Sequence, residues 1–400
     1  MALCLPRKRR AASLAIRPST LSVASITNHS CVTSAGFALK VDMCFPRVGC
    51  GVLFHGRCSS AGNLLGGDDN FAAGPCFRYE ACHSMAFLPF QARDLGGRLP
   101  WGMFSYRHAF HAGNHADVLK HTVLIAVMHH LALKDVGFTA IDTHSGPGLY
   151  RLDGADARQS GEAQEGLLAL MRNKSKLSGP MAPALQAYRA VLDHFNPKGG
   201  LLNYPGSPFI AQHLLREQDK LKLFEMHPTD IRALQANVDA LRVGRQVAVA
   251  HEDGFNGLPK YLPPPTRRGL VFIDPSYEIK LDYERVAVAV SMGLQRFATG
   301  TFVVWYPIIP RPQAHSLPKH LTTMARQAEK PWLHATLRIK SGARQAAVTG
   351  EPLKRLGLVE SGVVVINPPF TLHEQLKEAL PQMVQLMGQD DVAGFELTQG

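Results

Sequence analysis

Between residues 103 and 400, short apolar runs alternate with stretches in which apolar residues recur at helical spacing. Several of the runs are continuous rather than alternating, which is typical of parallel strands buried on both faces of a sheet. The predicted strands are Phe138–Asp142, Leu221–Glu225, Gln246–Ala250, Gly269–Asp274, Thr301–Tyr306, His334–Lys340 and Val363–Asn367. Strands separated by helices predict a doubly wound α/β sheet, which binds its ligands at the carboxyl ends of the strands.

One connection in this pattern is too long for a single helix. Asp142 ends the first predicted strand and Glu225 ends the second, and an ordinary helical crossover needs far less chain. The excess, about residues 152–203, has apolar residues at helical spacing, so we expect a small helical insertion. Ser207-Pro208 then predicts a new helix, with serine as its N-cap and proline as its first residue. A lid, a substrate platform and a stabilising packing element are all consistent with the insertion.

Residues 1–102 differ in composition from the rest of the chain. They contain all seven cysteines, and they carry 11 Lys/Arg against 5 Asp/Glu, whereas residues 103–400 carry 32 against 27. Residues 1–41 are rich in Arg, Ser and Ala and resemble an organelle transit peptide. Alternatively, the start codon was assigned too early and Met103 is the true start. These cysteines include no C-x-x-C pair, which is the spacing of zinc and redox modules. We therefore expect residues 1–102 to be an unstructured extension.

Acidic residues stand at the ends of four successive predicted strands. They are Asp142, Glu225, Asp253, which is followed by Gly254, and Asp274. Four carboxylates at one edge of a sheet repel one another unless a cationic or hydroxyl-rich ligand lies among them. An adenosyl cofactor with a ribose diol and a positive sulfonium meets both conditions.

The loop after the first strand also bears on the cofactor. Its sequence, residues 142–148, contains Gly146 and Gly148, which allow a ligand to approach the backbone closely. The third glycine of the dinucleotide-binding fingerprint is missing, which disfavours a nicotinamide oxidoreductase. S-adenosylmethionine has no phosphates and fits the loop better.

The segment Asp274-Pro275-Ser276-Tyr277 resembles the motif of methyltransferases that act on planar amines. The amine of adenine is a poor nucleophile because its lone pair is shared with the ring. Asp274 and the carbonyl of Pro275 would accept its two N–H bonds, and Tyr277 would stack on the base. Serine stands at 276 where this motif has a second proline. The segment 367–370, Asn-Pro-Pro-Phe, also matches the motif letter for letter. However, the catalytic motif should follow the fourth strand of the sheet, and too little chain follows residue 370 to form the remaining strands.

Ahead of the first strand, residues 105–121 are rich in aromatic and imidazole rings. His111, His115 and His121 raise the possibility of a metal site. The region after residue 102 has no cysteine and no H-E-x-x-H motif, and methyl transfer from a sulfonium needs no metal, so we expect none. We expect Lys120 and His121 to face the carboxylate of the cofactor and Tyr106 to reach the substrate.

The segments 105–121, 142–148, 204–208 and 274–278 together resemble the RlmJ family of bacterial 23S ribosomal RNA adenine-N6 methyltransferases. The resemblance begins at Met103. It implies a Rossmann-like class I S-adenosylmethionine-dependent methyltransferase fold, with a seven-stranded, mostly parallel sheet and an inserted helical subdomain, acting as a monomer on 23S rRNA. It also implies Asp274 as the catalytic residue, Tyr106 as a substrate contact, and a set of cofactor contacts. These are His121, His144, Ser207, Glu225, Asp253, Gly254 and Asp274.

The net charge of +11 suits an RNA substrate, although residues 103–400 hold less than half of it. Basic residues outside the motifs that could contact RNA are Lys174, Lys176, Arg267, Arg268, Lys354 and Arg355, although for each one taken alone we favour a solvated surface charge. Two alternatives stay open. One is a DNA adenine-N6 methyltransferase, for which no DNA-reading module is evident, and the other is a non-catalytic RNA-binding protein. No apolar run is long enough to span a membrane, so we expect a cytoplasmic protein, or an organellar one if residues 1–102 are a transit peptide.

Overall fold

The structure is a computed structural model that describes residues 108–342 and 357–400. Its centre is an eight-stranded sheet with the order β10-β8-β9-β7-β6-β1-β4-β5. The strands are β1 (Thr139–Asp142), β4 (Lys220–Phe224), β5 (Val247–Ala250), β6 (Gly269–Ile273), β7 (Thr301–Pro307), β8 (Trp332–Arg338), β9 (Glu360–Ile366) and β10 (Gly394–Gln399). Neighbouring strands from β5 to β7 are parallel, and β9 and β10 run in the opposite direction.

All seven predicted strands are present, with bounds within three residues of those predicted. The strands β1, β6 and β7 are buried at every position, which explains their continuous apolar runs. The predicted mostly parallel Rossmann-like sheet is therefore confirmed. An eighth strand, β10, extends it at the edge beside β8; most of its residues are exposed, so it has no apolar run for the sequence to reveal.

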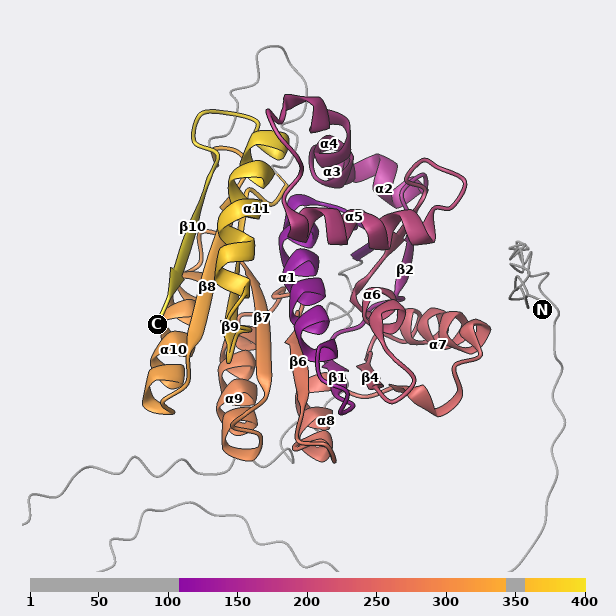
Figure 1. Cartoon of the computed structure of the whole chain (residues 1–400), viewed down its shortest axis with the longest axis vertical. Coiled ribbons are helices and arrows are strands. Elements are labelled where there is room, and N and C mark those ends of the chain that lie inside the picture. Colours follow the sequence, from indigo (N-terminus) through magenta and orange to yellow (C-terminus); the bar gives the residue numbers. More distant parts are fainter. Residues whose placement is uncertain (1–107, 343–356) are drawn as a thin grey trace, which may run out of the picture. The chain divides into compact units, whose positions relative to one another are not determined.

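Helices cover both faces of the sheet. Figure 1 shows α1 (His115–Ala132) and α11 (Leu372–Met387) on one face, and α9 (Leu281–Arg296) and α10 (Pro312–Gln327) on the other. The remaining elements of this part are α6 (Ser207–Leu214), α7 (Asp230–Leu241), α8 (Gly254–Gly257) and the 3-10 turns η3 (His108–Phe110), η5 (Gly244–Gln246) and η6 (Leu258–Tyr261). None of the helices that the structure describes is long and apolar enough to cross a membrane.

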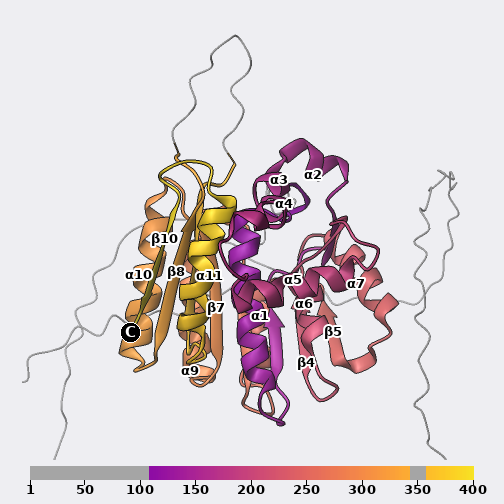
Figure 2. The same cartoon turned by 45° about the horizontal axis from the view of Figure 1, so that its top comes forward.

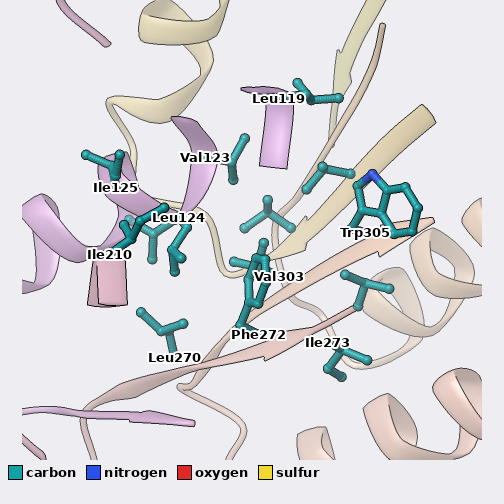
Figure 3. Close-up of a cluster of buried hydrophobic side chains, with 14 of the residues drawn as sticks. Leu119, Val123, Leu124, Ile125, Ile210, Leu270, Phe272, Ile273, Val303 and Trp305 are labelled. Carbon is teal, nitrogen blue, oxygen red and sulfur yellow. The ribbon is translucent and has the colours of Figure 1, made fainter. Parts of the chain in front are cut away.

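The core lies between α1 and the middle of the sheet. Leu119, Val123 and Leu124 of α1 face side chains of the strands β6 and β7, among them Phe272 and Val303, and all five are at most 1% exposed (Figure 3). This packing fixes α1 against the sheet. The polar side chains at the N-terminal half of α1 are thereby held at the edge where the parallel strands end.

The chain between β1 and β4 contains five short helical elements inside a small hairpin. The strands β2 (Leu149–Arg151) and β3 (Asn203–Pro205) pair in antiparallel fashion and enclose α2 (Ala155–Ser160), α3 (Glu162–Glu165), α4 (Leu167–Arg172), η4 (Asn173–Lys176) and α5 (Pro183–Phe195). Figure 2 shows α2, α3 and α4 grouped beyond one end of α1. Leu185, Tyr188 and Leu192 of α5 are buried in the same core as α1, so this segment packs on the sheet domain rather than forming a core of its own. The hairpin was not predicted, because three-residue strands leave little pattern in the sequence.

Candidate active site

The four strand-end acids lie at one edge of the sheet, as the sequence predicted. The strands β6, β1, β4 and β5 are consecutive neighbours and parallel, so Asp274, Asp142, Glu225 and Asp253 follow one another along their carboxyl ends. The rival Asn367 follows β9, which is antiparallel to β7, and therefore lies at the opposite edge. Its side-chain amide donates to the carbonyls of Ala298 and Gly300, which is a structural role.

Asp142 is the most enclosed of these acids. It is 3% exposed, and it accepts hydrogen bonds from the Ser207 hydroxyl at 2.7 Å and from the backbone N–H of His144 at 3.2 Å. Burial raises the pKa of Asp142 to about 7, against the opposing effect of these two donors. The prediction that Ser207 caps a helix is wrong, because Gly206 is the N-cap of α6 and Ser207 is its first residue. The Ser207 hydroxyl is used instead to hold the strand-end acid.

Glu225 is held by the loop after β1. Its two carboxylate oxygens accept from the backbone N–H groups of Gly146 and His227, both at 2.6 Å. Burial raises the pKa of Glu225 above its usual value. Gly146 has a φ of 58°, and a Cβ there would lie 2.5 Å from the Tyr150 hydroxyl. Only glycine therefore lets the loop pass so close to Tyr150 while its N–H reaches Glu225. The loop after β1 and Glu225 are thereby held together at the carboxyl ends of β1 and β4.

Asp253 belongs to a cluster that the sequence did not reveal. One carboxylate oxygen caps α8 by accepting the N–H of Phe255 at 2.9 Å, and the other accepts from Arg285 of α9 at 2.6 Å. The Arg285 guanidinium lies 4.5 Å from the centre of the Phe255 ring, and the His144 ring meets that ring edge-on at 4.7 Å. Burial lowers the pKa of His144 to about 4, so its imidazole is neutral at pH 7. Nothing in the sequence linked residue 285 to residue 253.

Gly254, the residue after Asp253, lies against the end of β1. A Cβ at this position would be 1.9 Å from the carbonyl oxygen of Thr143, a backbone atom that cannot move aside cheaply. The glycine therefore lets the loop after β5 pack on the loop after β1, which brings Asp253 and His144 together.

Asp274 is paired with a buried lysine. The ammonium of Lys120 on α1 lies 2.5 Å from Oδ2 of Asp274 and 2.8 Å from Oδ1 of Asp117, and it stands 5.1 Å from the centre of the Trp305 ring. Lys120 is 3% exposed. Burial lowers its pKa, but the two carboxylates raise it more, so the net pKa lies above the usual value and the side chain is charged at pH 7. We expected Lys120 to face the cofactor, and the structure places its charge on Asp274.

Asp117 joins this pair to the chain that precedes α1. Its Oδ2 accepts the backbone N–H of Gly113 at 2.7 Å and lies 3.3 Å from Nε2 of His108. Asp117 is fully buried. Burial raises its pKa, but Lys120 and His108 lower it by more, so the net pKa lies well below the usual value. The sequence analysis missed Asp117; its one sequence signal is the Asp-x-x-Lys spacing, which places residues 117 and 120 on one face of α1.

His121 also points into the buried part of the site. It is 1% exposed, its Nδ1 lies 2.7 Å from the Tyr204 hydroxyl, and that hydroxyl lies 3.2 Å from the hydroxyl of Tyr188. Burial lowers the pKa of His121 to about 3, so the imidazole is neutral. Tyr188 belongs to α5 and Tyr204 to β3, so the segment from β2 to β3 supports the site directly.

Tyr277 is in the left-handed region, with a φ of 53°, and is only 2% exposed. Its hydroxyl donates to the carbonyl of Trp305 at 2.7 Å, and its ring centre is 4.6 Å from that of Tyr283. Pro275 is buried and Ser276 is exposed, so the turn forms with serine in place of the second proline. Tyr106 lies outside the described residues. Among the residues that are described, no group of three His, Cys, Asp or Glu side chains is placed to hold a metal ion.

The sequence of this chain is similar to those of ribosomal RNA methyltransferases. Residues 135–397 match the family model described as "Ribosomal RNA large subunit methyltransferase D, RlmJ". The ribosomal RNA large subunit methyltransferase J of Escherichia coli strain K12 is 41% identical over 279 residues, which are 70% of this chain and 92% of that protein. The protein of the same name from Haemophilus influenzae strain Rd is 41% identical over 286 residues, 71% of this chain and 94% of that protein.

A solved structure supports the same assignment. A crystal structure of a protein from Legionella pneumophila strain Philadelphia 1 is 30% identical, has a TM-score of 0.61, and covers 72% of this chain and 98% of that one. The resemblance inferred from the motifs is therefore confirmed. The chain has a Rossmann-like methyltransferase fold and belongs to the RlmJ family of ribosomal RNA large subunit methyltransferases.

Proposed function

We propose that this protein transfers the methyl group of S-adenosylmethionine to the exocyclic N6 of a specific adenine in 23S ribosomal RNA. The observation that carries the proposal is the Asp274-Pro275-Ser276-Tyr277 turn at the end of β6, next in line to the strand-end acids of β1, β4 and β5. The relatives' names specify methylation of large-subunit ribosomal RNA. The base, the nitrogen and the cofactor are our own inference from the site.

The residues at this edge fit an adenosyl cofactor. Glu225 is fixed by two backbone donors and can accept hydrogen bonds from a ribose diol. Asp253, beside the Phe255 ring and the neutral His144, can accept a hydrogen bond from the adenine amine. Gly254 suits this position because its missing side chain lets the loop pack on the carbonyl of Thr143, and we assign its backbone to the cofactor contacts as well. We assign further cofactor contacts to His121 and Ser207, whereas the ammonium of Lys120 is engaged by Asp117 and Asp274. The bound cofactor would supply a methyl group on a positive sulfonium, which needs no metal.

Asp274 is the proposed catalytic residue. Lys120 holds one of its oxygens at 2.5 Å, which fixes the plane of the carboxylate. The other oxygen can then accept one N–H of the adenine, and the carbonyl of Pro275 can accept the second. These two bonds localise the lone pair on N6 and align it for attack, which is the contribution expected of a positioned acceptor.

Two aromatic residues are proposed to hold the base. Tyr277 would stack on the adenine, and its ring is held in place by the hydroxyl bond to Trp305 and by the Tyr283 ring, whose centre is 4.6 Å away. Because the ring is 2% exposed, stacking requires the side chains that cover it to move when the base enters. Tyr106 is the second proposed substrate contact.

Among the basic residues considered for RNA contact, Lys174 and Lys176 are exposed on η4. Arg268 is used structurally, because its guanidinium donates to the carbonyls of Leu131 and Val136. Arg267 is exposed, and Lys354 and Arg355 lie outside the described residues. We further propose that the protein acts as a cytoplasmic monomer, with residues 103–400 as its catalytic domain.

The test is methyl transfer from labelled S-adenosylmethionine to unmodified 23S rRNA by the full chain, followed by digestion to nucleosides. Label in N6-methyladenosine is the expected result. Label in another nucleoside would refute the proposed acceptor, and methylation of duplex DNA but not RNA would favour the DNA adenine methyltransferase. Cofactor binding without transfer to either would favour the non-catalytic RNA-binding protein.

A further inference from the structure

A cavity of about 390 Å³ lies outside the row of strand-end acids. Its walls come from η3, the start of β2 and the N-terminal turn of α7, and include His108, Pro147, Tyr150, Arg151, Thr229 and Ala233. None of the residues that we assign to the cofactor or to the target amine lines it. Its volume is in the range of pockets that hold small organic ligands.

The cavity shares a wall with the active site. The loop 146–148 donates the Gly146 N–H to Glu225 on one side, while Pro147 lines the cavity on the other. His108, a second lining residue, contacts Asp117, which in turn holds Lys120 on Asp274. A ligand in this cavity would therefore lie outside the cofactor and acceptor sites, and it would be connected to Asp274 through His108, Asp117 and Lys120.

The walls suit a nucleobase. The rings of His108 and Tyr150 meet edge to face, with their centres 5.2 Å apart, and Pro147 and Ala233 add apolar surface. Proteins recognise unstacked RNA bases with such surfaces, which provide aromatic and apolar contact together with a few polar groups. Asp230 also lines the cavity, and its carboxylate can accept an N–H of a base but would repel a phosphate.

The phosphate of such a nucleotide has a partner at the rim. The side chain of Arg151 is 52% exposed and is paired with Asp153, which is itself 43% exposed. An exposed pair of this kind contributes little to stability, so the guanidinium can exchange its carboxylate for a phosphate oxygen at low cost.

We propose that this cavity is a subsite for the nucleotide next to the target adenine, with its base inside and its phosphate at Arg151. The proposal rests on the proposed function, because an adenine that is methylated at N6 must leave its stack, and this unstacks its neighbour as well. The subsite would add affinity for RNA without touching the cofactor.

The test fills the cavity. Ala233→Trp places an indole in it, and Ala236→Trp is the matched control on an exposed position of the same helix. Using the full chain and an unmodified 23S rRNA fragment, we expect Ala233→Trp to raise the KM for RNA about tenfold, the effect of losing one stacked base. The kcat and the binding of S-adenosylhomocysteine should stay within about twofold of wild type, and Ala236→Trp should leave all three unchanged.

A second variant does not depend on packing. Arg151→Gln removes the rim charge, and Arg296→Gln is its control, on an exposed residue at the end of α9 away from the strand-end acids. Arg151→Gln should reduce the slope of log affinity against log salt by about 0.7, the value for one phosphate contact on a single strand. Arg296→Gln should leave the slope unchanged.

The possible failures are distinguishable. An unchanged KM for RNA in Ala233→Trp, or an unchanged salt slope in Arg151→Gln, would overturn the subsite while leaving the proposed function intact. If Ala233→Trp does not fold, as judged by S-adenosylhomocysteine binding, the Arg151→Gln slope decides alone. A wild-type protein that transfers no methyl group to RNA would refute the proposed function and the subsite with it.

Discussion

Asp142 offers a stability test that needs no substrate. Asp142→Asn keeps the size of the side chain and removes its ability to ionise. In the folded wild type, burial raises the pKa of Asp142 to about 7 from its usual value of 3.8. As pH rises through the range between these values, the unfolded chain ionises first, so the free energy of unfolding of the wild type falls. A shift of about three pKa units corresponds to up to about 4 kcal/mol.

The variant loses this dependence. The amide oxygen introduced by Asp142→Asn can accept the His144 N–H, but the amide nitrogen can only donate to the Ser207 hydroxyl, which must turn to accept; this rearrangement costs about 1 kcal/mol at every pH. We therefore expect Asp142→Asn to be slightly less stable than wild type near pH 4.5, and more stable by about 1 to 3 kcal/mol near pH 8. The measurement is the free energy of unfolding by urea of the full-length variant and wild type at both pH values. The difference between the two proteins near pH 4.5 is compared with their difference near pH 8.

A second buried aspartate provides a control of opposite sign. Asp219 is held by Arg216 and by the backbone N–H of Phe138, and although burial raises its pKa, these donors lower it to below the usual value. The ionised carboxylate stabilises the fold at pH values above the pKa that Asp219 has in the unfolded chain, and this stabilisation is lost as pH falls. Asp219→Asn should therefore lower the free energy of unfolding most near neutral pH. A difference between Asp142→Asn and wild type that does not change with pH would refute the assignment of a buried, high-pKa carboxyl at residue 142.

Three further predictions concern the active site and the domain boundary. Asp274→Asn should lower kcat by at least about 100-fold, with S-adenosylhomocysteine binding nearly unchanged in calorimetry; normal turnover would disprove its catalytic role. Arg285→Met should weaken S-adenosylhomocysteine about tenfold, because a charge-assisted bond that orients Asp253 is lost, and should reduce the preference for it over S-inosylhomocysteine, which lacks the amine. Arg296→Met is the control, and an unchanged preference would mean that Arg285 does not act through the adenine. A protein of residues 103–400 should fold and methylate RNA like the full chain, whereas an insoluble product would show that residues 1–102 are structural.

The sheet was predictable because its central strands are buried on both faces. Continuous apolar runs such as those of β6 and β7 leave a strong signal, whereas the exposed edge strand β10 leaves none. Once the strands were placed, parallel topology alone put Asp142, Glu225 and Asp274 at one edge. This part of the site followed from sequence because it depends on strand ends rather than on side-chain packing.

The contacts between these acids and other elements were not predictable in the same way. Arg285 reaches Asp253 from a different helix, and Lys120 pairs with Asp274, which is 154 residues away in the sequence. Ser207 had the sequence signature of a helix cap, but the loop before it placed Gly206 at the cap and turned the serine toward Asp142. Such choices depend on three-dimensional neighbours that a single sequence does not display.

The hydrogen bonds of His121 limit how freely the segment from β2 to β3 can be exchanged. An insertion of this kind could be exchanged in a chimeric protein for the corresponding loop of another methyltransferase. Here its last strand provides the Tyr204 hydroxyl that meets Nδ1 of His121, and its longest helix provides Tyr188 behind it. A graft without a hydroxyl at that point would leave a buried ring nitrogen unsatisfied beside the cofactor site, at a cost of about 1 to 3 kcal/mol. The segment is therefore part of the enzyme's framework, and chimeras should preserve both tyrosines.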